Sequence, residues 1–149
     1  MSFKFRADAA SDRKYITAEG VYNVTVKSVS FDYMPPRADF YARIVFETTE
    51  GESTSTEIFS KAEKSGRYLR LEQFVAATCN EVEAAKYATL AADFTPDEEF
   101  LKLVANRAVG RNLKVEVKKR EYTKKDGTQG VSYGASFFRR LPEGPDAPF

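Results

Sequence analysis

Residues 112–140 constrain the fold most, because their pattern fits a β-hairpin and little else. Leu113, Val115 and Val117 alternate with charged residues, which is typical of a strand with one buried face. Asp126-Gly127 supplies the positive backbone φ that a tight hairpin turn requires. We therefore predict strands over 113–122 and 131–139, joined by a turn at 124–128.

Residues 111–140 carry nine Lys or Arg and three Asp or Glu, an excess of six positive charges. Aromatic rings are interleaved with these charges, namely Tyr122, Tyr133, Phe137 and Phe138. Surfaces that offer cations to phosphates and flat rings to bases are typical of single-stranded nucleic acid binding. The alternative interpretation is a solvated hairpin whose rings belong to the core.

Three strands are expected before this hairpin, over 20–31, 40–48 and 53–60. In the first, the apolar face changes after Val26, which indicates a β-bulge near Lys27-Ser28. Two adjacent prolines favour a loop over 32–39. The second strand should bury Phe40, Ala42, Ile44 and Phe46, whereas the third has Ile58 and Phe59 on opposite faces and no clear buried side.

Between the third strand and the hairpin the apolar period changes to three and four residues. This predicts a helix over 66–79, a second of about ten residues capped by Asn80 with Glu83, and a third capped by Thr95 with Pro96 at its first position. The third helix should bury Phe100, Leu103 and Val104. Residues 81–99 hold six acids and one base, so this segment is acidic where the hairpin is basic.

Three strands, a helical segment and two strands give the element order of the OB-fold, a mainly β, five-stranded Greek-key barrel with helices between its third and fourth strands. We expect an N-terminal arm over 1–18, the barrel domain over 19–141 and a flexible tip over 142–149. The arm begins with the alternating piece Phe3-Lys4-Phe5-Arg6, whose rings are expected to pack on the body.

Composition excludes several kinds of site. Without histidine the chain cannot form a Ser-His-Asp triad, a Cys-His pair or a His-containing zinc site, and the single Cys79 cannot supply a Cys₄ site. Cys79 fits a small buried residue in a reducing cytoplasm. No apolar run is long enough to cross a membrane. We expect no cofactor, no metal site and no enzymatic activity.

The last residues, Glu143 to Phe149, resemble the C-terminal tip of bacterial and phage single-stranded DNA-binding proteins, where acids precede a terminal Pro-Phe. The layout from 19 to 141 is similar to that of the small phage-encoded members, in the opening Gly20-Val21-Tyr22-Asn23-Val24 and the re-entry Val109-Gly110-Arg111-Asn112-Leu113. The resemblance implies an OB-fold protein of the bacterial host cytoplasm that coats single-stranded DNA during replication, recombination and repair. It also implies docking of replication or recombination enzymes through Asp146, Pro148 and Phe149.

In an OB-fold the binding groove is formed by the face of the second and third strands and by two loops. On strand 131–139 we assign Val131, Tyr133, Ala135 and Phe137 to the core, so that Phe138 and Arg140 face outward. The predicted DNA-binding residues are Tyr33, Arg37, Tyr41, Arg43, Phe59, Lys118, Arg120, Tyr122, Lys124, Lys125, Phe138 and Arg140.

Three alternatives stay open. The groove could bind duplex DNA as well as single strands. The domain could instead be an OB-like structural or adaptor module of a phage that binds protein. Asp97, Glu116 and Lys118 formally match a metal-dependent PD-(D/E)xK nuclease, but Asp97 falls in a helix-start pattern and the other two in plain strand alternation.

Overall fold

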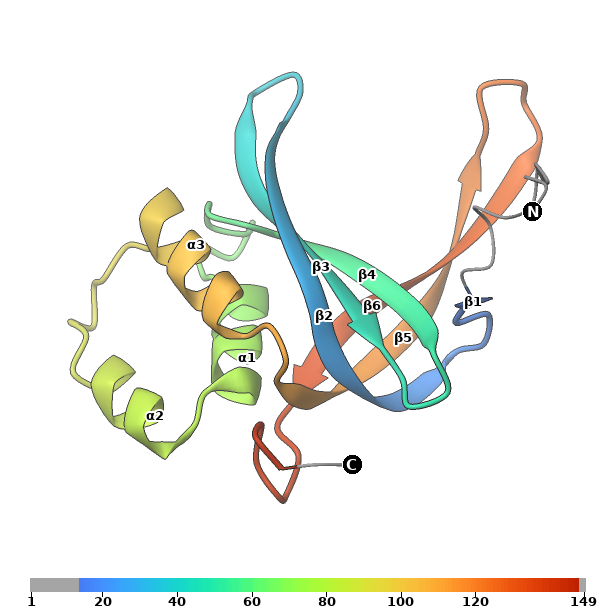
Figure 1. Cartoon of the computed structure of the whole chain (residues 1–149). Coiled ribbons are helices and arrows are strands. Elements are labelled where there is room, and N and C mark those ends of the chain that lie inside the picture. Colours follow the sequence, from blue (N-terminus) through green and yellow to red (C-terminus); the bar gives the residue numbers. More distant parts are fainter. Residues whose placement is uncertain (1–13, 148–149) are drawn as a thin grey trace, which may run out of the picture.

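The protein is described by a computed structural model that covers residues 14–147 (Figure 1). Within this range the chain is mainly β, with six strands in one curled sheet and three helices at one side of it (Figure 1). The elements are β1 (Lys14–Tyr15), β2 (Gly20–Met34), β3 (Asp39–Glu47), β4 (Glu52–Phe59), α1 (Leu69–Thr78), α2 (Glu81–Tyr87), α3 (Glu98–Arg107), β5 (Asn112–Thr123) and β6 (Gln129–Arg139).

The sheet curls because β2 is long and pairs with a different neighbour on each side. Its first residues pair antiparallel with β5, and its second half pairs antiparallel with β3, in a sheet of order β1-β4-β3-β2-β5-β6. The register with β3 passes from Val26 directly to Ser28, so Lys27 is the extra residue of a β-bulge. The predicted bulge is therefore confirmed.

The sheet curls until β6, at one end, approaches β4 along a seam, and β4 carries only the two-residue strand β1 on its outer edge. No backbone ladder joins β4 and β6. Instead the Thr54 hydroxyl donates to the carbonyl oxygen of Tyr133 at 2.9 Å, and the guanidinium of Arg70 on α1 donates to the carbonyl oxygen of Ala135 at 3.1 Å and to the Thr56 hydroxyl. The result is a curled half-barrel, consistent with the predicted β-barrel class.

The core lies inside this half-barrel and under α1. The predicted buried face of β3 is confirmed, since Phe40, Ala42, Ile44 and Phe46 are all buried. On β4 the buried side carries Thr54, Thr56 and Ile58, which resolves the face that the sequence left open. At the centre the ring of Phe74 on α1 lies 6.4 Å from that of Phe46 and 5.6 Å from that of Phe138.

Two helix predictions differ in outcome. Asn80 and Glu83 form the predicted capping box of α2, in which each side chain accepts from the other residue's backbone N–H. The predicted start of α3 is wrong by two residues, because the Asp97 side chain caps the helix by accepting from the Phe100 N–H. With this start Leu101 and Val104 are buried and Leu103 is 51% exposed, so the inward position assigned to Leu103 is also wrong.

The predicted inward face of β6 is wrong for half of its residues. The register with β5 passes from Glu116 opposite Phe137 to Val117 opposite Ala135, so Ser136 is an extra residue. An extra residue exchanges the two faces of a strand. Phe138 is therefore 4% exposed and belongs to the core, whereas Phe137 is 48% exposed.

The strands of both hairpins extend further toward the turns than the sequence predicted. β2 continues through Met34, which pairs with Asp39, so the loop expected over 32–39 shrinks to a turn at 35–38 that still contains both prolines. The β5–β6 hairpin and its turn at 124–128 form as predicted. Both hairpins project from the same side of the sheet (Figure 1).

Candidate nucleic-acid interface

The outer face of β3 and β4 carries two neighbouring aromatic rings. Tyr41 and Phe59 are directly paired across the two strands, and their ring centroids lie 5.5 Å apart at an interplanar angle of 44°. Strand alternation places both side chains on the face opposite the core, and there they are half-buried. Lys61, which was not among the predicted residues, holds its ammonium 5.8 Å from the Phe59 ring centroid and 2.6 Å from the Asp39 carboxylate. The pair thus offers an aromatic platform with a cation beside it.

Arg43 lies on the same face, two residues from Tyr41. Its guanidinium donates to the Glu57 carboxylate of β4 at 2.9 Å, and both side chains remain partly exposed. This hydrogen bond raises the pKa of Arg43, so the guanidinium keeps its charge. The structure therefore brings together three predicted residues, Tyr41, Arg43 and Phe59, on one surface.

The β5–β6 hairpin is stiffened at its turn. Lys124 donates its N–H to the Thr128 carbonyl oxygen at 2.7 Å, and the Asp126 carboxylate accepts from the Thr128 hydroxyl at 2.6 Å and from the Thr128 N–H at 3.0 Å. The hydroxyl bond, followed by the N–H bond, lowers the pKa of Asp126, so this carboxylate is ionised at neutral pH. Gly127 adopts φ +87, as the turn requires.

Five bases and one acid lie between residues 118 and 125 of this hairpin. Lys118 pairs with Glu116 at 2.9 Å, a hydrogen bond that raises the pKa of Lys118, and Lys119 pairs with Glu121 at 3.6 Å. Among residues 14–147 no ion pair is recorded for the exposed side chains Arg120, Lys124 and Lys125. The outer part of the hairpin therefore carries positive charge that the described residues do not neutralise.

Tyr122 lies flat against the backbone of the opposite strand. A Cβ added at its partner Gly130 would come within 2.4 Å of the Tyr122 ring, so glycine is required there for this contact. The ring is nevertheless 49% exposed. Tyr122 is thus a second aromatic surface, on the hairpin rather than on the β3–β4 face.

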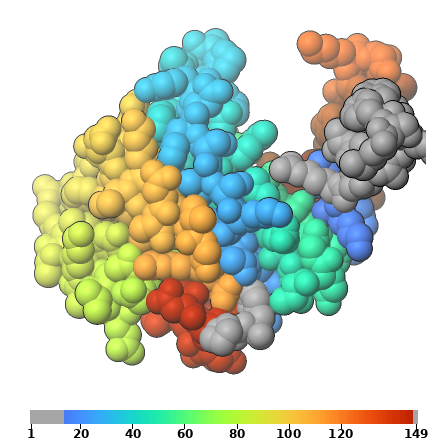
Figure 2. Space-filling model, in the orientation of Figure 1, coloured from blue at the N-terminus to red at the C-terminus, as the bar shows by residue number. Residues whose placement is uncertain are grey.

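A pocket of about 520 Å³ connects the β3–β4 face with the base of the β5–β6 hairpin. The pocket is lined by Arg43, Val45 and Ser55 from β3 and β4, by Val131, Ser132 and Tyr133 from β6, and by Tyr15 to Thr17 from the end of β1 and the residues after it. In Figure 2 the β2–β3 and β5–β6 hairpins stand apart as two arms with open space between their tips. Tyr15 was not predicted for this site. Tyr133 was predicted to lie in the core, and it is half-buried and packs against the core while it also lines the pocket.

Four predicted site residues lie elsewhere. Tyr33 faces α3, where its hydroxyl donates to Glu98 at 3.0 Å and its ring lies 5.2 Å from that of Phe40, on the opposite face from Tyr41. The hydrogen bond to Glu98 raises the pKa of Tyr33. Phe138 is in the core, so its outward assignment is wrong. Arg37 is exposed in the β2–β3 turn, and Arg140 lies beyond the far end of β6, close to Gly144.

The C-terminal segment folds back on the start of β5 as far as it is described. The carbonyl oxygen of Pro145 accepts from the Asn112 N–H at 2.7 Å, the carbonyl oxygen of Ala147 accepts from the Asn112 side chain, and Asp146 lies 3.6 Å from the Arg111 guanidinium. Of the predicted docking residues, only Asp146 lies within the described chain, and Pro148 and Phe149 lie outside it.

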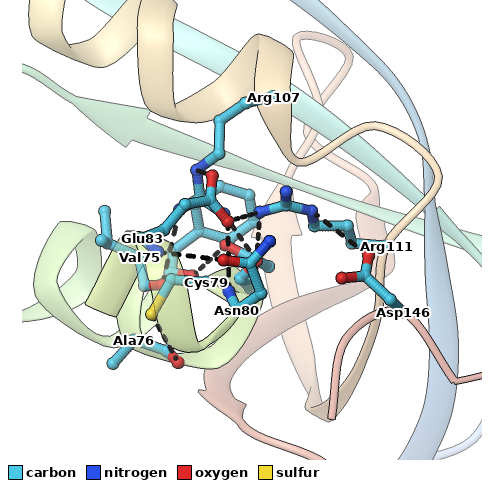
Figure 3. A network of polar contacts seen from close by, with 10 residues as sticks. Val75, Ala76, Cys79, Asn80, Glu83, Arg107, Arg111 and Asp146 are labelled. Carbon is cyan, nitrogen blue, oxygen red and sulfur yellow. Dashed lines mark hydrogen bonds and ion pairs between the residues drawn. The ribbon is translucent and has the colours of Figure 1, made fainter. Parts of the chain in front are cut away.

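Arg111 also belongs to a polar network that joins the helices to the barrel (Figure 3). The Glu83 carboxylate lies between Arg111, to which it is hydrogen-bonded, and Arg107, whose Nε is 3.4 Å away. Both guanidiniums donate to the carbonyl oxygen of Thr78 at the end of α1. Burial alone would raise the pKa of Glu83, but the Asn80 N–H and the two arginines outweigh it and hold that pKa below its usual value.

Comparison with known proteins does not extend these observations, because the sequence matches no protein-family model and no curated protein. None of the three helices described is long and apolar enough to cross a membrane. Over residues 14–147, no three His, Cys, Asp or Glu side chains are grouped so that they could hold a metal ion. Of the three residues in the nuclease pattern, Asp97 caps α3 and Glu116 is paired with Lys118.

Proposed function

We propose that this protein binds single-stranded DNA without sequence preference, as an OB-fold protein that coats and protects exposed strands during replication and recombination of phage DNA. The strand would lie across the β3–β4 face, between the two projecting hairpins. The observation that carries the proposal is the pair Tyr41 and Phe59, two adjacent rings on an outer sheet face with Arg43 and Lys61 beside them. These side chains point away from the core, so packing of the core does not account for them.

Each element of the interface has a distinct task. Tyr41, Phe59 and Tyr122 stack on bases, and stacking on an aromatic ring is worth about 1–3 kcal/mol per base and tolerates any sequence. Arg37, Arg120, Lys124 and Lys125, which have no recorded ion pair in the described range, neutralise phosphates. If all four are engaged, the slope of log K against log salt is roughly −2.8, from about −0.7 per phosphate on a single strand.

The test is a fluorescence anisotropy titration of labelled oligo(dT), mixed-sequence single strands and a duplex, each at two salt concentrations. We expect similar affinities for the two single strands, weaker binding of the duplex and a salt slope near the value above. Equal binding of duplex and single strands would redirect the proposal to duplex DNA. Absence of binding to any oligonucleotide would refute it and favour the protein-binding module.

The C-terminal residues are proposed to dock a replication or recombination enzyme. A terminal phenylalanine can fill an apolar pocket while its carboxylate and the nearby acids meet basic residues at the rim. We expect deletion of Pro148-Phe149 to leave the affinity for oligo(dT) unchanged and to abolish pull-down of the partner enzyme. Retention of the partner by the shortened chain would remove the tip from this role.

A further inference from the structure

A second hollow lies among the three helices, away from the β3–β4 face. It has a volume of about 420 Å³ and is lined by apolar side chains from α1, α2, α3 and the segment between α2 and α3. Tyr68, Leu71, Val75, Tyr87, Phe94 and Phe100 form most of its surface. We call it the helical groove. It has no part in the proposed DNA interface, which is built on β3, β4 and the two hairpins.

The helical groove is incompletely covered by the chain itself. Leu90 and Phe94 at its edge are 40% and 39% exposed, although both are large and apolar. Helix α2 has no buried residue at all, so it contributes half-covered side chains such as Tyr87 rather than a finished core. A large exposed apolar hollow on a folded domain marks a surface for a protein partner, a membrane or a ligand.

The surroundings of the groove are acidic. Residues 68–100 contain seven Asp or Glu and two Lys or Arg, a local charge of −5. Glu72 lines the groove and is paired with Arg67 at 3.1 Å, whereas Asp93 is exposed next to the lining residues Ala92 and Phe94. The occupant that complements such a surface combines aromatic or aliphatic side chains with positive charge.

One segment of this chain has that composition and lies outside the described residues. Phe3-Lys4-Phe5-Arg6 alternates rings with cations and contains no acid. In an extended peptide, alternate side chains point to opposite sides, so the two rings can enter a groove while the two cations stay at its mouth, where their long side chains can bend toward acidic residues of the rim.

The groove that this segment can reach belongs to another molecule. The described chain begins at Lys14 in β1, on the other side of the sheet from the helices (Figure 1). Seven residues lie between Arg6 and Lys14, and the eight Cα-to-Cα steps that join the two span at most about 29 Å when the chain is fully extended. A compact chain of this length is about 38 Å across, and a path to its own helices would have to follow the surface.

We propose that the helical groove binds the N-terminal segment Phe3-Lys4-Phe5-Arg6 of a second copy of this chain. The contact is head-to-tail, so it repeats from copy to copy and gives closed rings or open chains of molecules. Phe3 and Phe5 fill the apolar hollow, and Lys4 and Arg6 lie against the acidic residues around it.

The first test is a titration of a labelled peptide of residues 2–8 with the full-length protein, followed by anisotropy. We expect saturable binding that weakens as salt is raised. Leu90→Lys, which places a charge in the groove, should weaken binding by at least about tenfold. The matched control is Val82→Lys, a substitution of the same kind on α2 at a position that is 79% exposed and outside the groove.

The second test is sedimentation velocity of the full-length protein without DNA. We expect the sedimentation coefficient to rise with protein concentration, and the rise to disappear in both Leu90→Lys and Phe3→Ser/Phe5→Ser, but not in Val82→Lys. Circular dichroism establishes that each variant is folded.

Four outcomes would overturn the proposal. Peptide binding that is equal in Leu90→Lys and the native protein would place the peptide elsewhere. If a peptide with Lys4→Glu and Arg6→Glu binds as tightly as the native peptide, charge complementarity does not contribute to the binding. Peptide binding by a protein that stays monomeric at every concentration would mean docking within one molecule. Absence of peptide binding would leave the groove to a different partner.

Discussion

Removal of either ring from the β3–β4 face is the most direct test of the DNA interface. Tyr41→Ala and Phe59→Ala each delete one stacking surface and leave every Lys and Arg in place. With about 1–3 kcal/mol per stacked base, each variant should bind oligo(dT) about 5- to 160-fold more weakly than the native protein. Because neither substitution changes a charge, the slope of log K against log salt should stay the same.

The two substitutions should not add independently. The rings lie 5.5 Å apart and support each other, and an aromatic pair of this kind is worth about 0.5–1.5 kcal/mol beyond its buried area. Once one ring is lost, the other is less well held, so the double variant should lose less affinity than the sum of the two single losses. Anisotropy titrations of all four proteins, made under one set of conditions, give this coupling directly.

The matched control is Tyr33→Ala. Tyr33 is 50% exposed and close to Tyr41 along the β2–β3 pairing, but it faces α3. We expect its removal to leave oligo(dT) affinity within about twofold of the native value. Thermal unfolding of each variant confirms that it is folded at the assay temperature. The stacking interface is refuted if Tyr41→Ala and Phe59→Ala bind like the native protein, or if Tyr33→Ala weakens binding as much as they do.

Three further predictions concern the core, the polar network and the hairpin. Phe138→Ala should lower the free energy of unfolding, measured by urea titration, by about 3–5 kcal/mol, because the Phe138 ring is buried against Phe74. Phe137→Ala removes the exposed neighbouring ring and should lower it by less than about 1 kcal/mol. Similar values for the two variants would contradict the bulge at Ser136. Because the pKa of Glu83 is lowered, its ionised form stabilises the fold above pH 4.5, and this contribution is lost as pH falls through the lowered pKa. Glu83→Gln should therefore be less stable than the native protein at neutral pH and approach its stability in acid. A loss of stability that is equal at both pH values would exclude the charge of Glu83 as its cause. Lys124→Gln/Lys125→Gln should reduce the salt slope of oligo(dT) binding by about 1.4, and an unchanged slope would place the turn outside the DNA path.

Alternation predicted the strands well wherever one face was continuous. The even residues of β3 are apolar without a break, and all four are buried. The same rule failed on β6, because Ser136 is an extra residue that exchanges the two faces, and neither Ser136 nor its neighbours carry a local sign of it. The bulge at Lys27 was predictable, since there the apolar pattern itself changes face.

Two residues near the start of α3 can each serve as its N-cap, so the sequence did not fix where the helix begins. Thr95 and Asp97 can both cap a helix, and Pro96 fits the first helical position after Thr95. The structure uses Asp97, which shifts the buried face to Leu101 and Val104. No competitor stood beside Asn80 and Glu83, and that cap was predicted correctly.

The candidate interface was predictable in part for the same reasons. Tyr41, Arg43 and Phe59 follow from strand alternation and lie together on one face. Tyr33 was assigned to a loop, but β2 extends through it and its pairing with Phe40 directs it to α3. Tyr15 and Tyr133 enter the pocket through the curl of the sheet, which brings β6 to the same edge of β4 that pairs with β1, because β3 occupies the other edge. Such proximity depends on tertiary geometry and has no counterpart in local sequence.

The seam filled by Arg70 also bears on the solubility of the chain. A strand edge with free N–H and C=O groups can recruit strands from other molecules and start aggregation. In this protein β1 pairs with the start of β4, and the rest of that β4 edge faces the free edge of β6, where Arg70 occupies the gap with bonds to Glu57, Thr56 and Ala135. An invading strand would have to expel a guanidinium that is held by both edges, so the half-open sheet resists becoming a template for fibrils.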